Sequence, residues 1–173
     1  MSTIGIAGQA RSGKTTSTNY LLSKLDSTWV TDAFANPIKA MLEQLDVNCA
    51  DDNKNTVHPV IGVTPRVLMQ TLGTEWGRNA VDKDIWIKLL HHRNLNSENL
   101  IISDIRAENE ADYVRERGGL MIHLRAHGGI DSNHASEQLL EVKSGDIIIN
   151  NDGTLGQLYQ KLDEVISTIS SKP

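Results

Sequence analysis

The sequence holds one cysteine, Cys49, among its 173 residues. A single cysteine excludes an internal disulfide framework and a cysteine-rich zinc site, and it suits a reducing cytoplasm. The chain also lacks an apolar run near the ~18 residues that a membrane span needs, and its start lacks the basic and apolar regions of a secretory signal. Acidic residues outnumber basic ones and the net charge is −5, which argues against a broad basic face that binds nucleic acid. These absences favour small molecules as ligands.

What is present is an alternation of short apolar runs with helical patterns, without repeats, low-complexity tracts or a proline-rich linker. Asn36 is expected to cap a helix with Pro37 in its first turn, and Thr64 and Pro65 repeat that start signal. Five strands alternating with helices predict an α/β fold whose parallel sheet is covered on both faces and collects ligands at the carboxyl ends of its strands. The strands are expected at 3–7, 28–31, 100–103, 120–124 and 146–149, the other helices at 14–25, 84–94, 108–117 and 154–169, and a loop or insertion at 48–64.

Residues 8–15, GQARSGKT, match the phosphate-loop pattern G-x-x-x-x-G-K-[ST] in full. The motif follows a predicted strand and opens a predicted helix, which is the context that it requires. Its glycines let the backbone curl, so that successive N–H groups and the positive end of the helix dipole face phosphate oxygens. Lys14 is expected to reach the β- and γ-phosphates of a nucleotide, and the Thr15 hydroxyl to bind Mg²⁺.

Further motifs separate the classes of phosphate-loop protein. A GTPase switch would need D-x-x-G after the central strand, and DIRA at 104–107 does not match it. NKNT at 53–56 lacks the carboxylate of the guanine motif N-K-x-D, and the chain is too short for a large motor or transport ATPase. A small-molecule kinase remains.

The eight arginines are placed unevenly along the chain. Arg11 lies in the phosphate loop, Arg66 opens the third helix and Arg78 follows it. Arg106 lies just past the third strand and Arg125 at the end of the fourth. The planar fork of arginine suits phosphate oxygens and the charge that develops in phosphoryl transfer, so these five predict a phosphate-binding cluster. The other three fall in ordinary helix-face patterns: Arg93, Arg115 and Arg117.

With these residues in view, the sequence resembles the phage-type deoxynucleoside monophosphate kinases, within the nucleoside monophosphate kinase family of phosphate-loop proteins. The segment RVLMQTLGTEWGR at 66–78 is the most particular part of the resemblance. The other carriers span nearly the whole chain: the phosphate loop, FANPIK at 34–39, DIR with NE at 104–110, and NNDGTL at 150–155.

The resemblance implies one phosphate-loop kinase domain over residues 1–173, with a three-layer α/β/α core around a five-stranded parallel sheet. A substrate-binding section of about residues 34–95 would lie between the second and third strands, and a lid of about residues 125–140 would follow the fourth. The implied reaction transfers the γ-phosphoryl group of ATP to a deoxynucleoside monophosphate, which yields the diphosphate and ADP.

The resemblance also implies roles for individual residues. The catalytic residues would be Lys14, Arg11, Arg106, Arg125 and Asp104, with Mg²⁺ on Thr15 and, through water, on Asp104. ATP would bind Gly8, Ala10, Arg11, Ser12, Gly13, Lys14, Thr15 and Thr16, and its adenine would meet Asn151, Gly153, Thr154 and Leu155, largely through their backbone groups. The monophosphate substrate would bind Lys39, Arg66, Gln70, Gly73, Thr74, Arg78, Trp86, Asp104, Arg106, His134 and Glu137.

Several of these residues have a second interpretation. Asp104 could cap the helix that follows its strand, and Trp86 could be buried beneath the substrate section instead of stacking on a base. His134 and Glu137 could contact a base, a lid arginine or a partner subunit, or could belong to a short capped helix.

The function itself has two alternatives. One is another small phosphate-loop kinase that phosphorylates dephospho-coenzyme A or gluconate, and the other is a switch that binds ATP without transfer. The intact Lys14, Thr15 and Asp104 speak against the switch. No nucleic acid polymer and no membrane is expected as a partner, and a homodimer is left open. The expected location is the cytoplasm, that of the host cell if the chain is of phage origin.

Overall fold

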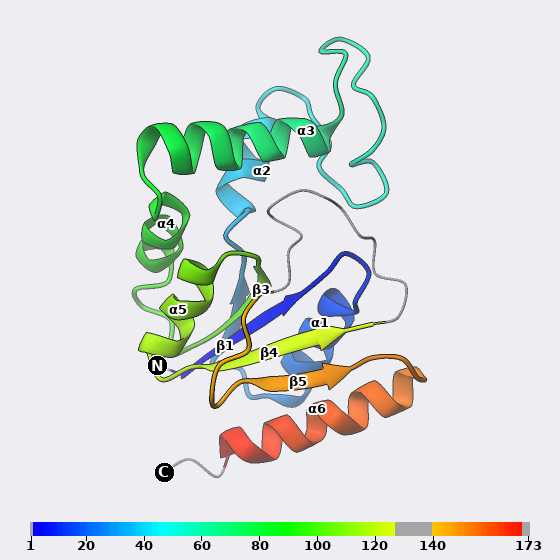
Figure 1. Cartoon of the computed structure of the whole chain (residues 1–173), viewed down its shortest axis with the longest axis vertical. Helices are drawn as coiled ribbons and strands as arrows, with labels where there is room; N and C mark the ends of the chain where they lie inside the picture. Colours follow the sequence, from blue (N-terminus) through cyan, green and yellow to red (C-terminus); the bar gives the residue numbers. More distant parts are fainter. Residues whose placement is uncertain (1, 127–139, 171–173) are drawn as a thin grey trace. The chain divides into compact units, whose positions relative to one another are not determined.

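The computed structural model describes residues 2–126 and 140–170, and within them the chain folds as two compact units (Figure 1). The first unit is formed by Met1–Ala33 with Asn94–Pro173, and the second by Phe34–Arg93.

A five-stranded sheet forms the centre of the first unit. Its strand order is β2-β3-β1-β4-β5, and all neighbouring pairs are parallel. The predicted α/β fold is therefore confirmed. The strands are β1 (Ser2–Gly8), β2 (Trp29–Asp32), β3 (Asn99–Ile105), β4 (Leu120–Arg125) and β5 (Ile147–Asn150).

Helices cover both faces of this sheet (Figure 1). On one face, Ile4 and Ile6 of β1 pack in a buried cluster with Leu21 of α1 (Lys14–Lys24) and with Leu158 and Leu162 of α6 (Leu155–Ser170). The other face is covered by α5 (Glu108–Glu116). The result is the three-layer α/β/α arrangement that the resemblance implied.

The register of the strands aligns their carboxyl ends. Gly8 at the end of β1 pairs with Leu124, and Ala7 pairs with Ile105 after a register shift that begins at Gly5. The phosphate loop therefore leaves the sheet at its carboxyl edge, which is the side on which β1, β3 and β4 all end.

The second unit contains α2 (Asn36–Glu43), α3 (Pro65–Gln70), the π-helix η1 (Thr71–Val81) and α4 (Ile85–Arg93). Thr64 caps α3 as predicted, since its Oγ1 accepts a hydrogen bond from the N–H of Val67 at 3.4 Å. Asn36 does not cap α2: Ala35 is the N-cap, and Asn36 is the first helical residue with Pro37 next to it. The expectation that Arg78 follows the third helix was also wrong, because α3 continues into η1 and Arg78 lies within it.

Turns and irregular chain connect α2 to α3 over residues 48–64, as the polar composition there predicted. None of the helices in the described part of the chain combines the length and the apolar character that a bilayer crossing needs.

Candidate active site

The phosphate loop connects β1 to α1 within the first unit. Three of its residues have positive φ angles: Gly8 at 155°, Arg11 at 64° and Gly13 at 101°. Arg11 adopts the left-handed conformation although it carries a side chain, and such a residue is held there at a cost of about 1 kcal/mol or more. The backbone thus has the sharp curl that the sequence motif predicted.

The loop ends at the N-terminus of α1. Gly13 is the N-cap, and no side chain of the described residues caps this helix. The first N–H groups of a helix have no intrahelical acceptor, so here they are available to an anion. The Nζ of Lys14 donates to the carbonyl oxygens of Gly8 and Gln9, each at 2.7 Å. Thr15 is exposed on the first turn, and Thr16 is half-buried.

Three further predicted residues lie at the same edge of the sheet. Asp104 and Arg106, both half-buried, flank the β3 residue that pairs with Ala7. Arg125 is exposed and ends β4, one residue beyond the partner of Gly8. The structure therefore brings one carboxylate and two guanidinium groups to the edge that carries the phosphate loop. Their roles in the reaction stay predictions.

Glu110 of α5 holds two consecutive backbone N–H groups in the connection from β3 to α5, and the sequence had given it no role. Its Oε2 accepts hydrogen bonds from the N–H of Arg106 at 2.8 Å and from the N–H of Ala107 at 3.1 Å. The side chain is 1% exposed. A buried carboxylate thus fixes the path of the chain at Arg106. The signal in the sequence was the spacing of a glutamate three residues into a helix, which is half of a capping box.

The segment predicted to line the adenine pocket follows β5. Its first residue, Asn151, donates from Nδ2 to the carbonyl oxygen of Ser12 in the phosphate loop at 3.0 Å. Thr154 caps the start of α6, since its Oγ1 accepts from the N–H of Gln157 at 3.3 Å. Gly153 and Leu155 are exposed. The sequence predicted backbone contacts here and missed the side-chain contact to the phosphate loop.

Most of the residues predicted to bind the substrate phosphate lie on α3 and η1, which form one continuous helical segment of the second unit. Arg66, in the first turn of α3, donates from Nε to Oδ1 of Asn55 at 2.8 Å, and its N–H donates to the Lys54 carbonyl at 3.0 Å. Gln70 ends α3, the half-buried Lys39 belongs to α2, and the rest lie in η1: Gly73, Thr74 and Arg78.

The π-helical form of η1 was not predicted. A π-helix has i→i+5 hydrogen bonds, is rare, and often occurs at functional sites. Trp86 of α4 packs against it: the ring is 2% exposed and its Nε1 donates to the Gly73 carbonyl at 2.8 Å. A Cβ on Gly77 would lie 2.4 Å from that ring. Trp86 is therefore buried, as its second interpretation expected, and a contact with a base stays a prediction.

His134 and Glu137 lie outside the described residues, as does most of the predicted lid.

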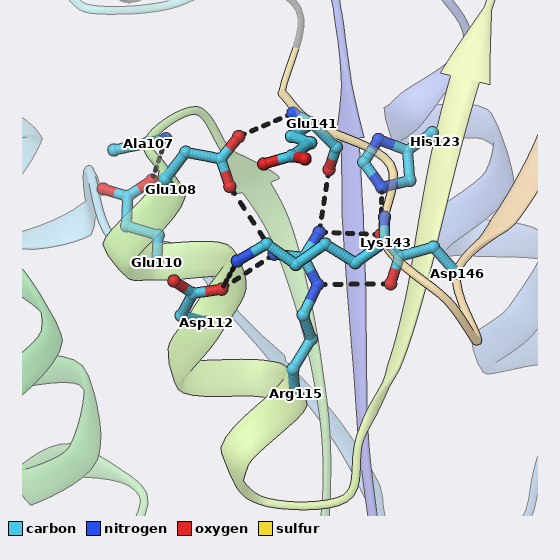
Figure 2. Close-up of polar contacts among 9 residues, drawn as sticks. All are labelled: Ala107, Glu108, Glu110, Asp112, Arg115, His123, Glu141, Lys143 and Asp146. Atoms are coloured by element: carbon cyan, nitrogen blue, oxygen red, sulfur yellow. Dashed lines mark hydrogen bonds and ion pairs between the residues drawn. The ribbon is translucent and has the colours of Figure 1, made fainter.

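A network of charged side chains joins α5 to β4 and to the segment before β5 (Figure 2). Arg115 donates to Asp146 at 2.7 Å and to Asp112 at 2.9 Å, and Nε2 of His123 lies 2.8 Å from the Asp146 carboxylate. Lys143 also contacts Asp112 at 2.7 Å. Sequence patterning placed Arg115 on an ordinary helix face, which was wrong, because its side chain is 16% exposed and pairs with carboxylates.

Asp146 titrates far from its ordinary range. Burial raises its pKa, but hydrogen bonds from Arg115, the N–H of Lys143 and His123 outweigh that effect and lower the pKa to about 2. The carboxylate therefore stays charged at neutral pH, although its side chain is only 3% exposed.

The sequence model of the deoxynucleotide monophosphate kinase family matches residues 46–162. A protein of Acanthamoeba polyphaga mimivirus, which carries the same kinase name provisionally, is 31% identical over 189 residues, covering 96% of this chain and 97% of the relative. The deoxynucleotide monophosphate kinase of Enterobacteria phage T4 is 33% identical over 110 residues, and that of Escherichia phage RB69 is 31% identical over 107 residues. These alignments cover 46% and 44% of the two phage enzymes, so the chain spans less than half of their length.

Among solved structures, an unliganded sugar kinase from Janibacter sp. aligns with 97% of this chain and 93% of its own at a TM-score of 0.45 and 14% identity. That likeness is too distant to support a function. The family match covers most of the chain, and the mimivirus relative matches nearly all of it. The resemblance seen in the sequence is thereby confirmed: this chain belongs to the deoxynucleotide monophosphate kinase family of phosphotransferases.

Proposed function

We propose that this chain transfers the γ-phosphoryl group of ATP to a deoxynucleoside monophosphate. A phosphate oxygen of the monophosphate forms a bond to the γ-phosphorus, the bond from that phosphorus to the β-γ bridging oxygen breaks, and ADP leaves. The observation that carries the proposal is the phosphate loop at the sheet edge where Asp104, Arg106 and Arg125 also lie, in a chain of this family.

The acceptor in this reaction is a phosphate oxygen that is already anionic at neutral pH. The protein therefore needs no general base, and its work is to align the two nucleotides and to neutralise charge. Lys14 would leave the carbonyls of Gly8 and Gln9 to contact the β- and γ-phosphates. Arg11, Arg106 and Arg125 would contact the transferring group. Exclusion of water would prevent hydrolysis of ATP.

The residues at the loop also fit a magnesium ion. Thr15 offers a hydroxyl on the first turn of α1, and Asp104 offers a carboxylate at the same sheet edge. These are hard oxygen ligands, which Mg²⁺ takes together with substrate phosphates and several waters. When bound, Mg²⁺ would supply charge neutralisation at the β- and γ-phosphates.

The remaining assignments extend the same proposal. Residues 34–95, with Lys39, Arg66, Gln70, Gly73, Thr74, Arg78 and Trp86, would bind the monophosphate, and residues 125–140, with His134 and Glu137, would form the lid. Exposed Gly153, Thr154 and Leu155, with Asn151, would line the adenine pocket. We place the enzyme in the cytoplasm, with small nucleotides and no nucleic acid polymer or membrane as partners.

The test is an ADP-release assay with ATP and Mg²⁺ across a panel of acceptors. The panel contains dGMP, dTMP, dCMP and dAMP, the matching ribonucleotides, dephospho-coenzyme A and gluconate. We expect ADP release to depend on at least one deoxynucleoside monophosphate. Turnover with dephospho-coenzyme A or gluconate and with none of the nucleotides would overturn the proposal, and so would ATP binding without turnover of any acceptor.

A further inference from the structure

Asn151 joins three segments of the first unit that are far apart in the sequence. It follows β5 directly, and its N–H donates to the carbonyl oxygen of Arg125 at the end of β4 at 2.6 Å. Its side chain donates from Nδ2 to the carbonyl oxygen of Ser12 at 3.0 Å, across 139 positions of sequence. The side-chain amide is oriented by its partner, because a carbonyl oxygen can only accept a hydrogen bond.

The carbonyl that Asn151 holds belongs to the peptide between Ser12 and Gly13. The described residues contain no cis peptide bond, and in a planar trans peptide the C=O and the N–H point in opposite directions. A side chain that fixes the direction of the Ser12 carbonyl therefore fixes the direction of the Gly13 N–H as well. That N–H belongs to the loop whose amides are expected to bind phosphate.

Gly13 makes this contact sterically possible. Its φ of 101° is one that residues with a side chain rarely adopt, and a Cβ there would lie 2.6 Å from Nδ2 of Asn151. The same glycine leaves the peptide easy to rotate, since no side chain opposes a flip of the Ser12–Gly13 plane. A flipped plane would present a carbonyl oxygen to the phosphates and repel them, so a loop with glycine here needs an external contact that selects one orientation.

We propose that Asn151 is a positioning residue for the donor nucleotide: its side-chain amide holds the Ser12–Gly13 peptide so that the Gly13 N–H faces the nucleotide phosphates. Asn151 also begins the segment proposed to line the adenine pocket, so it links the part of the site that contacts the base to the part that contacts the phosphates. This inference rests on the proposed function for the identity of the donor.

Two substitutions test it. Asn151→Asp keeps the size of the side chain and replaces the donor by an acceptor that repels the Ser12 carbonyl, and Asn151→Ala removes the contact. We expect the KM for ATP to rise about tenfold or more, because the hydrogen bond from the Gly13 N–H to the charged phosphates would be lost. The KM for the monophosphate should stay within about twofold, because no contact to the substrate section is removed. The matched control is Asn150→Asp, an exposed neighbour that adds the same charge and should change neither constant by more than about twofold.

A spectroscopic readout separates positioning from a general structural effect. Labelling with ¹³C-carbonyl serine and ¹⁵N-glycine selects Ser-Gly peptides, of which the sequence has two, Ser12-Gly13 and Ser144-Gly145. In the wild type, the Gly13 N–H signal should move downfield when ADP and Mg²⁺ are added. In both Asn151 variants the free-state signal of Gly13 should be displaced and its response to ADP reduced, while Gly145 serves as the internal reference.

The outcomes separate this proposal from the proposed function. If the wild type neither binds ADP nor turns over ATP, the proposed function fails. If the wild type does both, and the folded variants keep the wild-type KM for ATP and the wild-type Gly13 response, the role of Asn151 is overturned. Should one variant unfold, the other decides. Should both unfold, the wild-type titration decides, because a Gly13 signal that does not move while ADP binds contradicts the proposal.

Discussion

Two groups of charged side chains in the first unit differ in their surroundings. At the carboxyl edge of the sheet, Arg11 is exposed within the phosphate loop, where its own backbone is strained, and Arg125 is exposed at the end of β4. On α5, Arg115 is 16% exposed and lies between the carboxylates of Asp112 and Asp146. The same residue type is thus left exposed in one region and paired with carboxylates in the other.

Burial and pairing, more than residue type, separate the two uses of an arginine. A guanidinium that already donates to two carboxylates has few donors left for phosphate, and its removal leaves the buried Asp146 carboxylate with His123 but without its guanidinium partner. A guanidinium at an exposed edge contributes little to stability and can turn to a ligand. Substitutions in the two regions should therefore separate activity from stability.

The largest effect is expected at the phosphate loop. Lys14→Ala should lower kcat/KM for deoxynucleoside monophosphate phosphorylation by about 10³-fold, because it removes a cation from the transferring phosphates. Its free energy of unfolding, from urea titration, should change by no more than about 1 kcal/mol. Lys24→Ala is the matched control, since Lys24 is exposed in the last turn of the same helix. Unchanged turnover in Lys14→Ala would contradict the catalytic role of Lys14. The two regions would then no longer differ in their effects on activity and stability.

The next effect is expected in the network of Figure 2. Arg115→Ala should lower the free energy of unfolding by about 3 kcal/mol, because it leaves Asp146 buried without its main cationic partner. At a temperature where the variant is folded, kcat should stay within about twofold of the wild type. Arg117→Ala is the control: Arg117 is exposed one residue beyond α5, over the Tyr113 ring, and its loss should cost less than about 1 kcal/mol. A large loss of kcat in folded Arg115→Ala would show that the network serves the reaction as well.

The phosphate loop shows how much of a site the sequence can predict. Its motif fixes residue types at adjacent positions, so the turn, the helix start and the location of Lys14 follow from local spacing. The gathering of Asp104, Arg106 and Arg125 was predictable for a related reason, because carboxyl ends of parallel strands meet at one edge.

The contacts of Glu110 are local and had a signal in the spacing at the helix start, whereas the other contacts that were missed depend on tertiary structure. Asn151 lies 139 positions from Ser12, and Asp146 lies 31 positions from Arg115. No local pattern encodes such a pair, because the partners meet only when the helices and loops are assembled around the sheet. The π-helix was missed for the same reason: its sequence has ordinary helical spacing, and the contacts of Trp86 with Gly73 and Gly77 come from a different helix.

The smallest effect is a pH dependence of stability that should come from the buried network. The pKa of Asp146 is about 2 in the folded chain against an ordinary 3.8. A carboxyl with a lowered folded pKa stabilises the protein fully above its unfolded pKa, and that contribution is lost as pH falls toward the folded pKa. The difference corresponds to about 2 kcal/mol, lost progressively between about pH 5 and pH 2. Arg115, His123 and the N–H of Lys143 face the carboxylate.

Urea unfolding of the wild type and of Asp146→Asn between pH 6 and pH 2.5 measures this contribution. The two stability curves should converge by about 2 kcal/mol as pH falls, because the variant has no carboxyl to protonate at that position. Asp52→Asn, in an exposed turn of the second unit, should run parallel to the wild type over the same range. Parallel curves for the wild type and Asp146→Asn would mean that the Asp146 carboxylate contributes no more to the pH dependence of stability than an exposed one. Arg115 would then be as available to a ligand as the arginines at the carboxyl edge of the sheet. Burial and pairing would no longer separate the two regions.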